Sequence, residues 1–130
     1  MLKTLNEAIR SDVSFRPQNL TATANGIAVD TDRFDDAQAI LDVGAVTGTS
    51  PTLDTKFQES ADGSSGWTDI TGATIAQITT ADQHKTLGIN LRSVKRYIRA
   101  VATITGTSPT FQTGLSVNLG TTDKYPVTQL

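Results

Sequence analysis

The sequence contains no cysteine, so neither a disulfide nor a thiolate metal site can form. It also has no apolar run of the ~18 residues that a membrane-spanning helix needs. Residues 1–7 lack the apolar core of a secretion signal. These absences argue against a disulfide-rich secreted scaffold, a helical membrane protein and an exported precursor.

The sequence also lacks a large excess of either charge, because its net charge is only -2. A field this weak does not draw a protein to DNA or RNA, so we expect no nucleic-acid partner. Histidine occurs once, as His84 in the polar stretch 79–85, which we expect to be a loop. No Gly-x-Ser-x-Gly turn supplies a nucleophile for a catalytic triad. We therefore predict a protein that binds or builds a structure, not an enzyme, with no cofactor.

Threonine is abundant, with 22 residues in a chain of 130. Thr is β-branched and suits the half-buried surface of a pleated sheet. A chain of this length fits one domain and buries enough surface to fold without disulfides or metals. Composition therefore favours strands.

Apolar and polar residues alternate in the segments 87–91, 98–104 and 111–119. That period of two is typical of strands with one solvent-exposed face. The residues predicted to form the core share the apolar faces of these strands; they are Leu87, Ile89, Ile98, Ile104, Phe111, Leu115 and Val117.

Turn signals divide the remaining sequence into further short strands. Asn25-Gly26 readily adopts the positive φ of a type I′ turn, which predicts a tight hairpin between residues 20–24 and 27–29. Residues 61–66 are expected to form a second hairpin loop. Turn signals about every 8–12 residues predict an all-β fold, an antiparallel β-sandwich that is jelly-roll-like, over residues 20–130.

One heptapeptide pattern occurs twice in the chain. Residues 46–52 read Val-Thr-Gly-Thr-Ser-Pro-Thr, and residues 104–110 read Ile-Thr-Gly-Thr-Ser-Pro-Thr. Gly permits a bend, whereas Pro fixes φ and cannot donate to a strand ladder. We interpret the pair as one turn chemistry at equivalent corners of a two-sheet fold, each copy joining two strands. A ligand-binding role is the alternative.

Residues 1–19 lack a strand pattern and are predicted to be an N-terminal arm outside the sandwich. Spaced apolar side chains of this kind can order in a groove on a partner, so we expect an arm ordered only in an assembly. Disorder is the alternative. The apolar anchors of the arm are Leu2, Leu5, Ile9, Val13 and Phe15.

Two charged segments are separated by about half the chain. The acidic segment departs from a calcium-binding EF-hand loop, because no Gly follows its third acidic position and no Glu closes it. A solvated acidic turn is the main interpretation and a calcium site the alternative. We expect the basic segment to pair with these carboxylates or with those of a neighbour. The residues are Asp30, Asp32, Asp35 and Asp36 with Arg92, Lys95, Arg96 and Arg99.

Residues 60–67, Ser-Ala-Asp-Gly-Ser-Ser-Gly-Trp, resemble the Asp-box hairpin of sialidases and propellers, with the glycine one place early. In that motif the residues stabilise the hairpin. We expect Trp67 to anchor the hairpin to the core, the alternative being an exposed ring that stacks on a sugar. Glu59 and Asp69 could face each other across this hairpin, which leaves a glycosidase pair as a weaker alternative.

Three parts of the sequence together carry a family resemblance. They are residues 26–30 leading to 34–37, then 57–63 with 67–70, then 95–101. In this order they resemble small structural proteins of tailed bacteriophages and prophages, over about residues 20–120. The resemblance implies a jelly-roll or similar β-sandwich. Several proteins of this kind are capsid decoration, or cement, proteins, which sit as oligomers on the shell and brace it.

The resemblance therefore implies a virion protein on the capsid surface, made in the cytoplasm of a bacterial host. Its implied partners are the major capsid protein and further copies of itself, with no membrane partner. A neck or tail structural protein is one alternative. A carbohydrate-binding β-sandwich module is the other.

Overall fold

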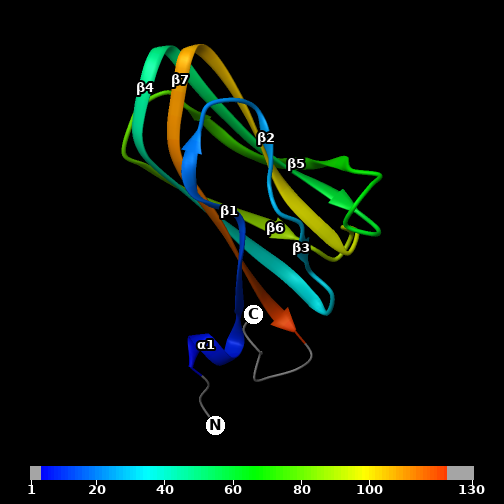
Figure 1. Cartoon of the computed structure of the whole chain (residues 1–130). Coiled ribbons are helices and arrows are strands. Elements are labelled where there is room, and N and C mark those ends of the chain that lie inside the picture. The colour runs from blue at the N-terminus through cyan, green and yellow to red at the C-terminus, as the bar shows by residue number, and fades with distance from the viewer. Residues whose placement is uncertain (1–3, 123–130) are drawn as a thin grey trace.

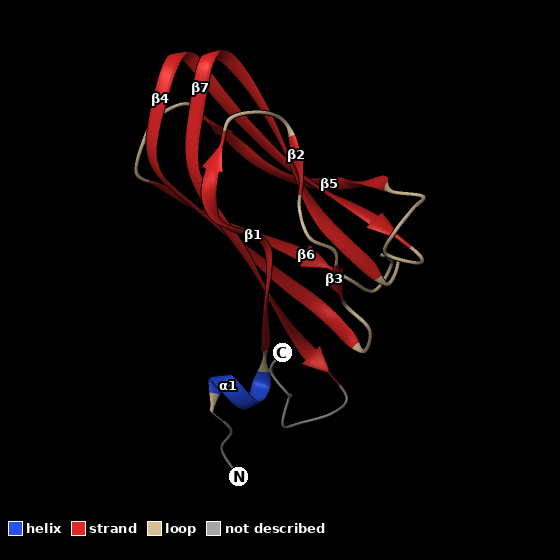
Figure 2. Ribbon diagram, viewed as in Figure 1, coloured by secondary structure: helices blue, strands red, loops and turns tan. Residues whose placement is uncertain are grey.

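The computed structural model describes residues 4–122. One helical turn, α1 (Leu5–Ala8), precedes an otherwise all-β fold (Figures 1 and 2). The strands are antiparallel, so the predicted fold class is confirmed. In chain order they are β1 (Arg10–Leu20), β2 (Ala24–Asn25), β3 (Val29–Asp30), β4 (Phe34–Ser60), β5 (Thr68–Ile78), β6 (Gln83–Asn90) and β7 (Tyr97–Thr122).

Two long strands, β4 and β7, run side by side through the whole domain. They pair from Phe34 opposite Thr122 to Ser60 opposite Tyr97. One end of the pair is flanked by β6 and β1, which gives a first layer ordered β6-β4-β7-β1. The other end is flanked by β5 and by the short β2 and β3, which gives a second layer. Figure 1 shows β4 and β7 arching together from one layer to the other.

The duplicated heptapeptide forms this arch. Residues 46–52 lie against 104–110, with Thr49 opposite Thr107 and register shifts on either side. Gly48 and Gly106 have φ values of 112° and 123°. A Cβ on Gly48 would lie 2.8 Å from Pro109 Cα, and one on Gly106 would lie 2.9 Å from Pro51 Cα. Each copy's glycine therefore makes room for the other copy's proline.

The heptapeptides occupy equivalent corners, as expected, but they do not join separate strands. The backbone ladder continues through both copies, so 38–47 and 53–60 belong to the single strand β4. The two bends lie side by side, and each glycine makes room for the other copy's proline, so the backbones stay paired across the register shifts.

The core fills the space between the two layers. Six of the seven residues predicted to form it are buried, and Leu87 is half-buried against them. Phe57 and Phe111 are the largest side chains that are fully buried. The alternation along β7 therefore identified the inward faces correctly in both layers.

The hairpin predicted at Asn25-Gly26 is wrong. β2 and β3 do not pair with each other, and both pair with β7 as two pieces of one interrupted edge strand. A Cβ on Gly26 would lie 2.3 Å from Ser14 Oγ, and the Gly26 N–H donates to the Ala100 carbonyl at 2.7 Å. Glycine is needed here for a close backbone approach, not for a turn.

The predicted boundary at residue 19 is also wrong. Arg10–Leu20 is strand β1, which pairs with β7 from Leu119 to Phe111. Phe15 and Leu20 are buried in the core, and the buried Ser14 hydroxyl accepts from the Ala100 N–H at 3.0 Å. Bulges and Pro17 interrupt the alternation of β1, which hid the strand in the sequence. Of residues 4–19, only those before Arg10 lie outside the sheet.

Deletion of residues 1–9 should leave the melting temperature nearly unchanged, because α1 buries none of its residues. Deletion of residues 1–19 should abolish cooperative folding, because it removes Ser14 and Phe15 from the interior and leaves the edge of β7 bare. Circular dichroism melting of the two fragments measures both. A fragment 20–130 that melts cooperatively at the full-length temperature would restore the boundary predicted from the sequence.

Gly48→Ala and Gly106→Ala should each lower the free energy of unfolding by about 1–3 kcal/mol, since the new methyl group meets backbone atoms in the left-handed region. Gly88→Ala is the matched control, because its Cβ would have nothing within 4 Å. We expect the control to change stability by less than about 0.5 kcal/mol. Urea unfolding gives all three values, and equal effects at the three sites would contradict the account of the arch.

Candidate functional site

Part of the acidic segment lies against part of the basic segment, where β3 meets β7. Arg96 donates from Nε to Asp30 Oδ1 at 3.0 Å and from Nη2 to Asp30 Oδ2 at 2.9 Å. Its Nη2 also lies 4.0 Å from Asp32 Oδ2. Arg92 Nε lies 3.9 Å from Asp35 Oδ2. The predicted pairing of the two segments therefore occurs within one chain for Arg92 and Arg96.

The other predicted members of this cluster have different partners. The backbone N–H of Lys95 donates to Glu59 Oε2 at 3.1 Å. Arg99 donates to Gln58 on the outer face of the second layer. The Asp36 carboxylate accepts from the Ala37 N–H at 3.1 Å. The eight charged residues thus do not form one patch.

The pKa of Asp30 is lowered mainly by its bidentate partner, Arg96. The hydrogen bonds from Arg96 hold the pKa of the Asp30 carboxyl below its ordinary value of 3.8, and the Asp32 N–H adds a smaller effect of the same sign. Both side chains are partly exposed, so solvent screening keeps the contribution of the pair to folding small. Among residues 4–122, no group of three or more His, Cys, Asp or Glu is placed to hold a metal ion.

A polar network covers the outer face of the second layer. The Arg99 guanidinium stacks 4.3 Å from the centroid of the Trp67 ring and donates twice to Gln58 Oε1. Gln58 in turn donates to Asp69 at 2.9 Å, and Lys56 donates to the same carboxylate at 3.0 Å. Trp67 is half-buried under this cation and outside the hydrophobic core, so its packing differs from the core anchor that we expected.

The hairpin after β4 is held by its own polar side chains. Asp62 Oδ1 accepts from the Ser64 and Ser65 N–H groups, each at 2.9 Å, which keeps the pKa of Asp62 far below its usual range. The Ser60 hydroxyl donates to the Ser65 carbonyl, and Gly63 lies against the Tyr97 ring. These bonds stabilise the hairpin, in agreement with the resemblance to an Asp-box.

The three residues weighed for catalysis, His84, Glu59 and Asp69, form no catalytic arrangement with one another. His84 is in strand β6, not in a loop, and its Nδ1 contacts the carboxylate of Asp42, its cross-strand neighbour. Asp69 is opposite Gln58, the residue next to Glu59 in β4. Because neighbouring residues of a strand point to opposite faces, Glu59 and Asp69 lie on different faces and form no glycosidase pair.

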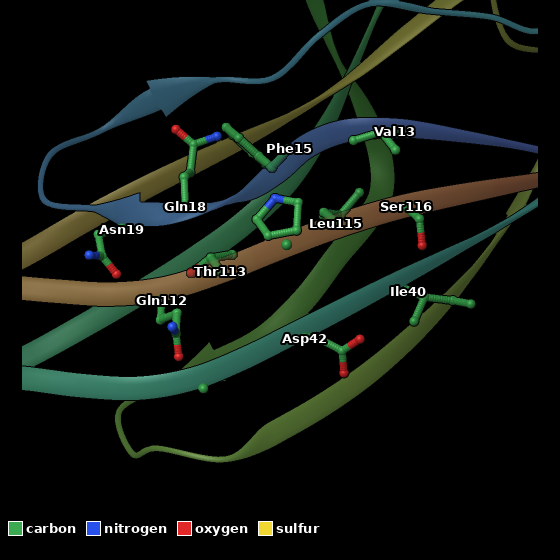
Figure 3. Close-up of a pocket in the computed structure, with 13 residues that line it drawn as sticks. Val13, Phe15, Gln18, Asn19, Ile40, Asp42, Gln112, Thr113, Leu115 and Ser116 are labelled. Atoms are coloured by element: carbon green, nitrogen blue, oxygen red, sulfur yellow. The ribbon is translucent and has the colours of Figure 1, made fainter. Parts of the chain in front are cut away.

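A hollow lies on the outer face of the first layer (Figure 3). It has a volume of about 530 Å³ and lies over β1, β4 and β7. Its floor includes Gly114, over which Pro17 packs at 3.6 Å from the position of a Cβ. Side chains of Ile40 and Ser116 also line it, and Asp42 adds a carboxylate.

A second hollow, of about 420 Å³, lies over β4, β6 and β7 beside the end of α1. Its lining includes Leu5 and Ile9 together with Gln38, Asn118 and Gly120. Leu5 nevertheless remains 72% exposed, the most exposed of the large hydrophobic side chains in the described residues. Of the other predicted anchors, Val13 and Phe15 belong to β1, and Leu2 lies outside the described residues.

Sequence reasoning missed both hollows. The available signal was the outward face of β7, which carries Gln112, Gly114, Ser116, Asn118 and Gly120. The small residues at 114, 116 and 120 leave space, but nothing in the sequence alone shows that the neighbouring strands leave it open as well.

No protein-family model matches the sequence, and no curated protein matches it. Solved structures do match the fold. A chain from the structure of infectious bursal disease virus Gx strain has a TM-score of 0.63 at 12% identity, over 91% of this chain and 33% of that chain. The SPBc2 prophage-derived protein YomS has a TM-score of 0.50 at 10% identity, over 93% of this chain and 99% of that one. A chain of Bacillus endospore appendages, described as disulfide-linked pili, has a TM-score of 0.47 at 14% identity, over 95% and 98%.

The likeness is one of fold. This chain spans about a third of the length of the matching virus chain and nearly the whole of the prophage-derived protein. The predicted sandwich is thus an architecture found in a virus and in a prophage-derived protein. Within residues 4–122, no helix is long and apolar enough to cross a membrane.

The stability that the Arg96–Asp30 pair provides should depend on pH with a definite sign. The folded-state pKa of Asp30 lies below its unfolded value, so the contribution is complete above pH 3.8 and is lost as the pH falls through the folded pKa. We expect Asp30→Asn to melt below the wild type at neutral pH and to approach it in acid. Melting temperatures measured across the acid range test this, and a constant difference at all pH values would contradict it.

Proposed function

We propose that this chain is a structural protein of a tailed-phage or prophage virion, and specifically a capsid decoration protein that binds the assembled shell as a homo-oligomer. The observation that carries the proposal is the shared sandwich, which covers over nine-tenths of this chain in the virus and prophage comparisons. The sequence resemblance to phage structural proteins supports the same class. The major capsid protein is the proposed partner, and the capsid surface the proposed location.

A decoration protein stabilises a shell by mass action. It binds the assembled lattice and not the free subunits, so its binding free energy adds to the stability of the assembled state. A rigid sandwich with short loops loses little conformational freedom on binding, which favours such a role. The hollowed outer face of the first layer offers a surface for contact.

The carbohydrate-binding alternative is less well supported. A sugar platform needs an accessible aromatic face, whereas the Trp67 ring lies under the guanidinium of Arg99. The neck or tail alternative is separated from decoration by the experiment below.

The test is deletion of the gene from the phage or prophage that encodes it, followed by purification of the particles. Heads that lack the protein should release DNA at a lower temperature than wild-type heads, and addition of the purified chain should restore that temperature. Bovine serum albumin at the same concentration is the control for non-specific protection. Cryo-electron microscopy should place the added density on the shell.

Heads of unchanged thermal stability, with the density located at the neck or tail, would replace decoration by the alternative virion role. Purified particles that contain none of the protein would overturn a virion role altogether.

A further inference from the structure

The outer face of the second layer carries charged side chains from β4, β5 and β7. Leu53, Thr55 and Phe57 are buried in β4, so the alternate residues 54, 56 and 58 point outward. Residues opposite this outward row share its face, which adds residue 99 from β7 and residue 69 from β5. The charged residues of the face are therefore Asp54, Lys56, Asp69 and Arg99.

Arg99 is the cation of this face that no carboxylate neutralises. It donates from Nε and Nη2 to Gln58 Oε1, a neutral acceptor, at 3.1 and 2.9 Å, and its guanidinium stacks on Trp67. Lys56, by contrast, lies 3.0 Å from the carboxylate of Asp69. Within residues 4–122, Arg99 forms no ion pair. The stack and the two hydrogen bonds orient the guanidinium and leave further N–H donors for an anionic acceptor.

Asp54 is the matching carboxylate. It accepts from Gln77 Nε2 at 3.2 and 3.1 Å, and it forms no ion pair with another of the described residues. In the register of β4 and β7, Asp54 is opposite Thr103. Arg99 lies four residues away along β7, roughly 13 Å, which is too far for an ion pair within one chain. The face thus presents one cation and one carboxylate, each oriented by a glutamine and neither neutralised.

A second copy of the same face supplies the missing partner of each charge. A two-fold axis in the plane of the contact, midway between Arg99 and Asp54, exchanges the two positions. Arg99 of each protomer then meets Asp54 of the partner subunit, and the contact closes as a dimer with two identical ion pairs. Lys56 lies between the two pairs, where its own Asp69 neutralises it. Trp67 beside Arg99 adds aromatic surface, and Trp and Arg are enriched among the residues that contribute most to protein interfaces.

We propose that the outer face of the second layer is the self-association surface of this protein, with two symmetric Arg99–Asp54 ion pairs between two copies. This inference rests on the homo-oligomer of the proposed function and assigns that oligomer a contact. It leaves the outer face of the first layer free for a different partner. It also gives Arg99 a neighbour's carboxylate, the alternative that the sequence left open for the basic segment, although that carboxylate comes from β4 and not from the acidic segment.

Charge reversal followed by mixing tests the contact. Arg99→Glu brings two carboxylates together at each pair and Asp54→Arg brings two cations together, so each variant alone should self-associate at least about tenfold more weakly than the wild type. An equimolar mixture of the two variants should associate again, because each reversed charge meets the reversed charge of the other chain. A loss caused by misfolding would not recover on mixing. Sedimentation velocity of the full-length chains over a range of concentrations measures each case.

Arg16→Glu and Asp36→Arg are the matched controls, because both residues are exposed and belong to strands β1 and β4 of the first layer. Alone or mixed, they should self-associate like the wild type. Trp67 gives a second readout, since it is the only tryptophan and contacts Arg99. Its fluorescence should change with protein concentration in the wild type and in the mixture of Arg99→Glu with Asp54→Arg, but not in either variant alone.

A wild-type chain that stays monomeric, single variants that associate as the wild type does, or a mixture that does not recover would each overturn the contact. A monomeric wild type whose protection of deleted heads is lost with Arg99→Glu would overturn the second copy in favour of a shell subunit on this face. Failure of the proposed function is measured separately: a chain that dimerises through this face but is absent from purified particles would confirm the contact and overturn the virion role.

Discussion

Every other strand of the described chain pairs with either β4 or β7, and these two pair with each other along their whole length. β1, β2 and β3 lie on β7, whereas β5 and β6 lie on β4. The sandwich therefore depends on one ladder that bends without breaking. The bend is possible because Gly48 and Gly106 accept the left-handed backbone and the close approach of the opposite strand. The two copies of the heptapeptide, at 46–52 and 104–110, supply the two bends that pack against each other.

The two outer faces that this ladder creates have different character. On the second layer, Arg99, Trp67 and their neighbours bond to one another and cover the sheet. On the first layer, glycine and serine leave hollows that the side chains of the domain do not fill. The proposed decoration role needs a stable body and a surface open to neighbours, and this division of the faces is compatible with it.

The sequence predicted the parts of the fold that obey a simple period. β7 alternates cleanly, so its buried face and the sandwich class followed from residues such as Ile98 and Leu115. β1 was missed because its bulges and Pro17 disrupt the alternation. The Asn25-Gly26 hairpin was wrong because glycine is needed at position 26 for close contact with Ser14, a residue that only the fold brings near.

The candidate sites were predicted only in part from the sequence. Complementary charge indicated the contact between Arg96 and Asp30, but not which of the other cations would find different partners. The larger of the two hollows depends on what the three neighbouring strands β1, β4 and β7 leave empty, which no single segment of sequence records.

Hydrogen–deuterium exchange along β4 and β7 tests most directly whether one ladder unites the two layers. If it does, the amides of both strands on both sides of the arch will exchange only through global unfolding, with a common free energy equal to that from urea unfolding. If one layer exchanges completely while the other stays protected, the layers are separate cooperative units, and the continuous β4–β7 ladder is not what holds the protein together.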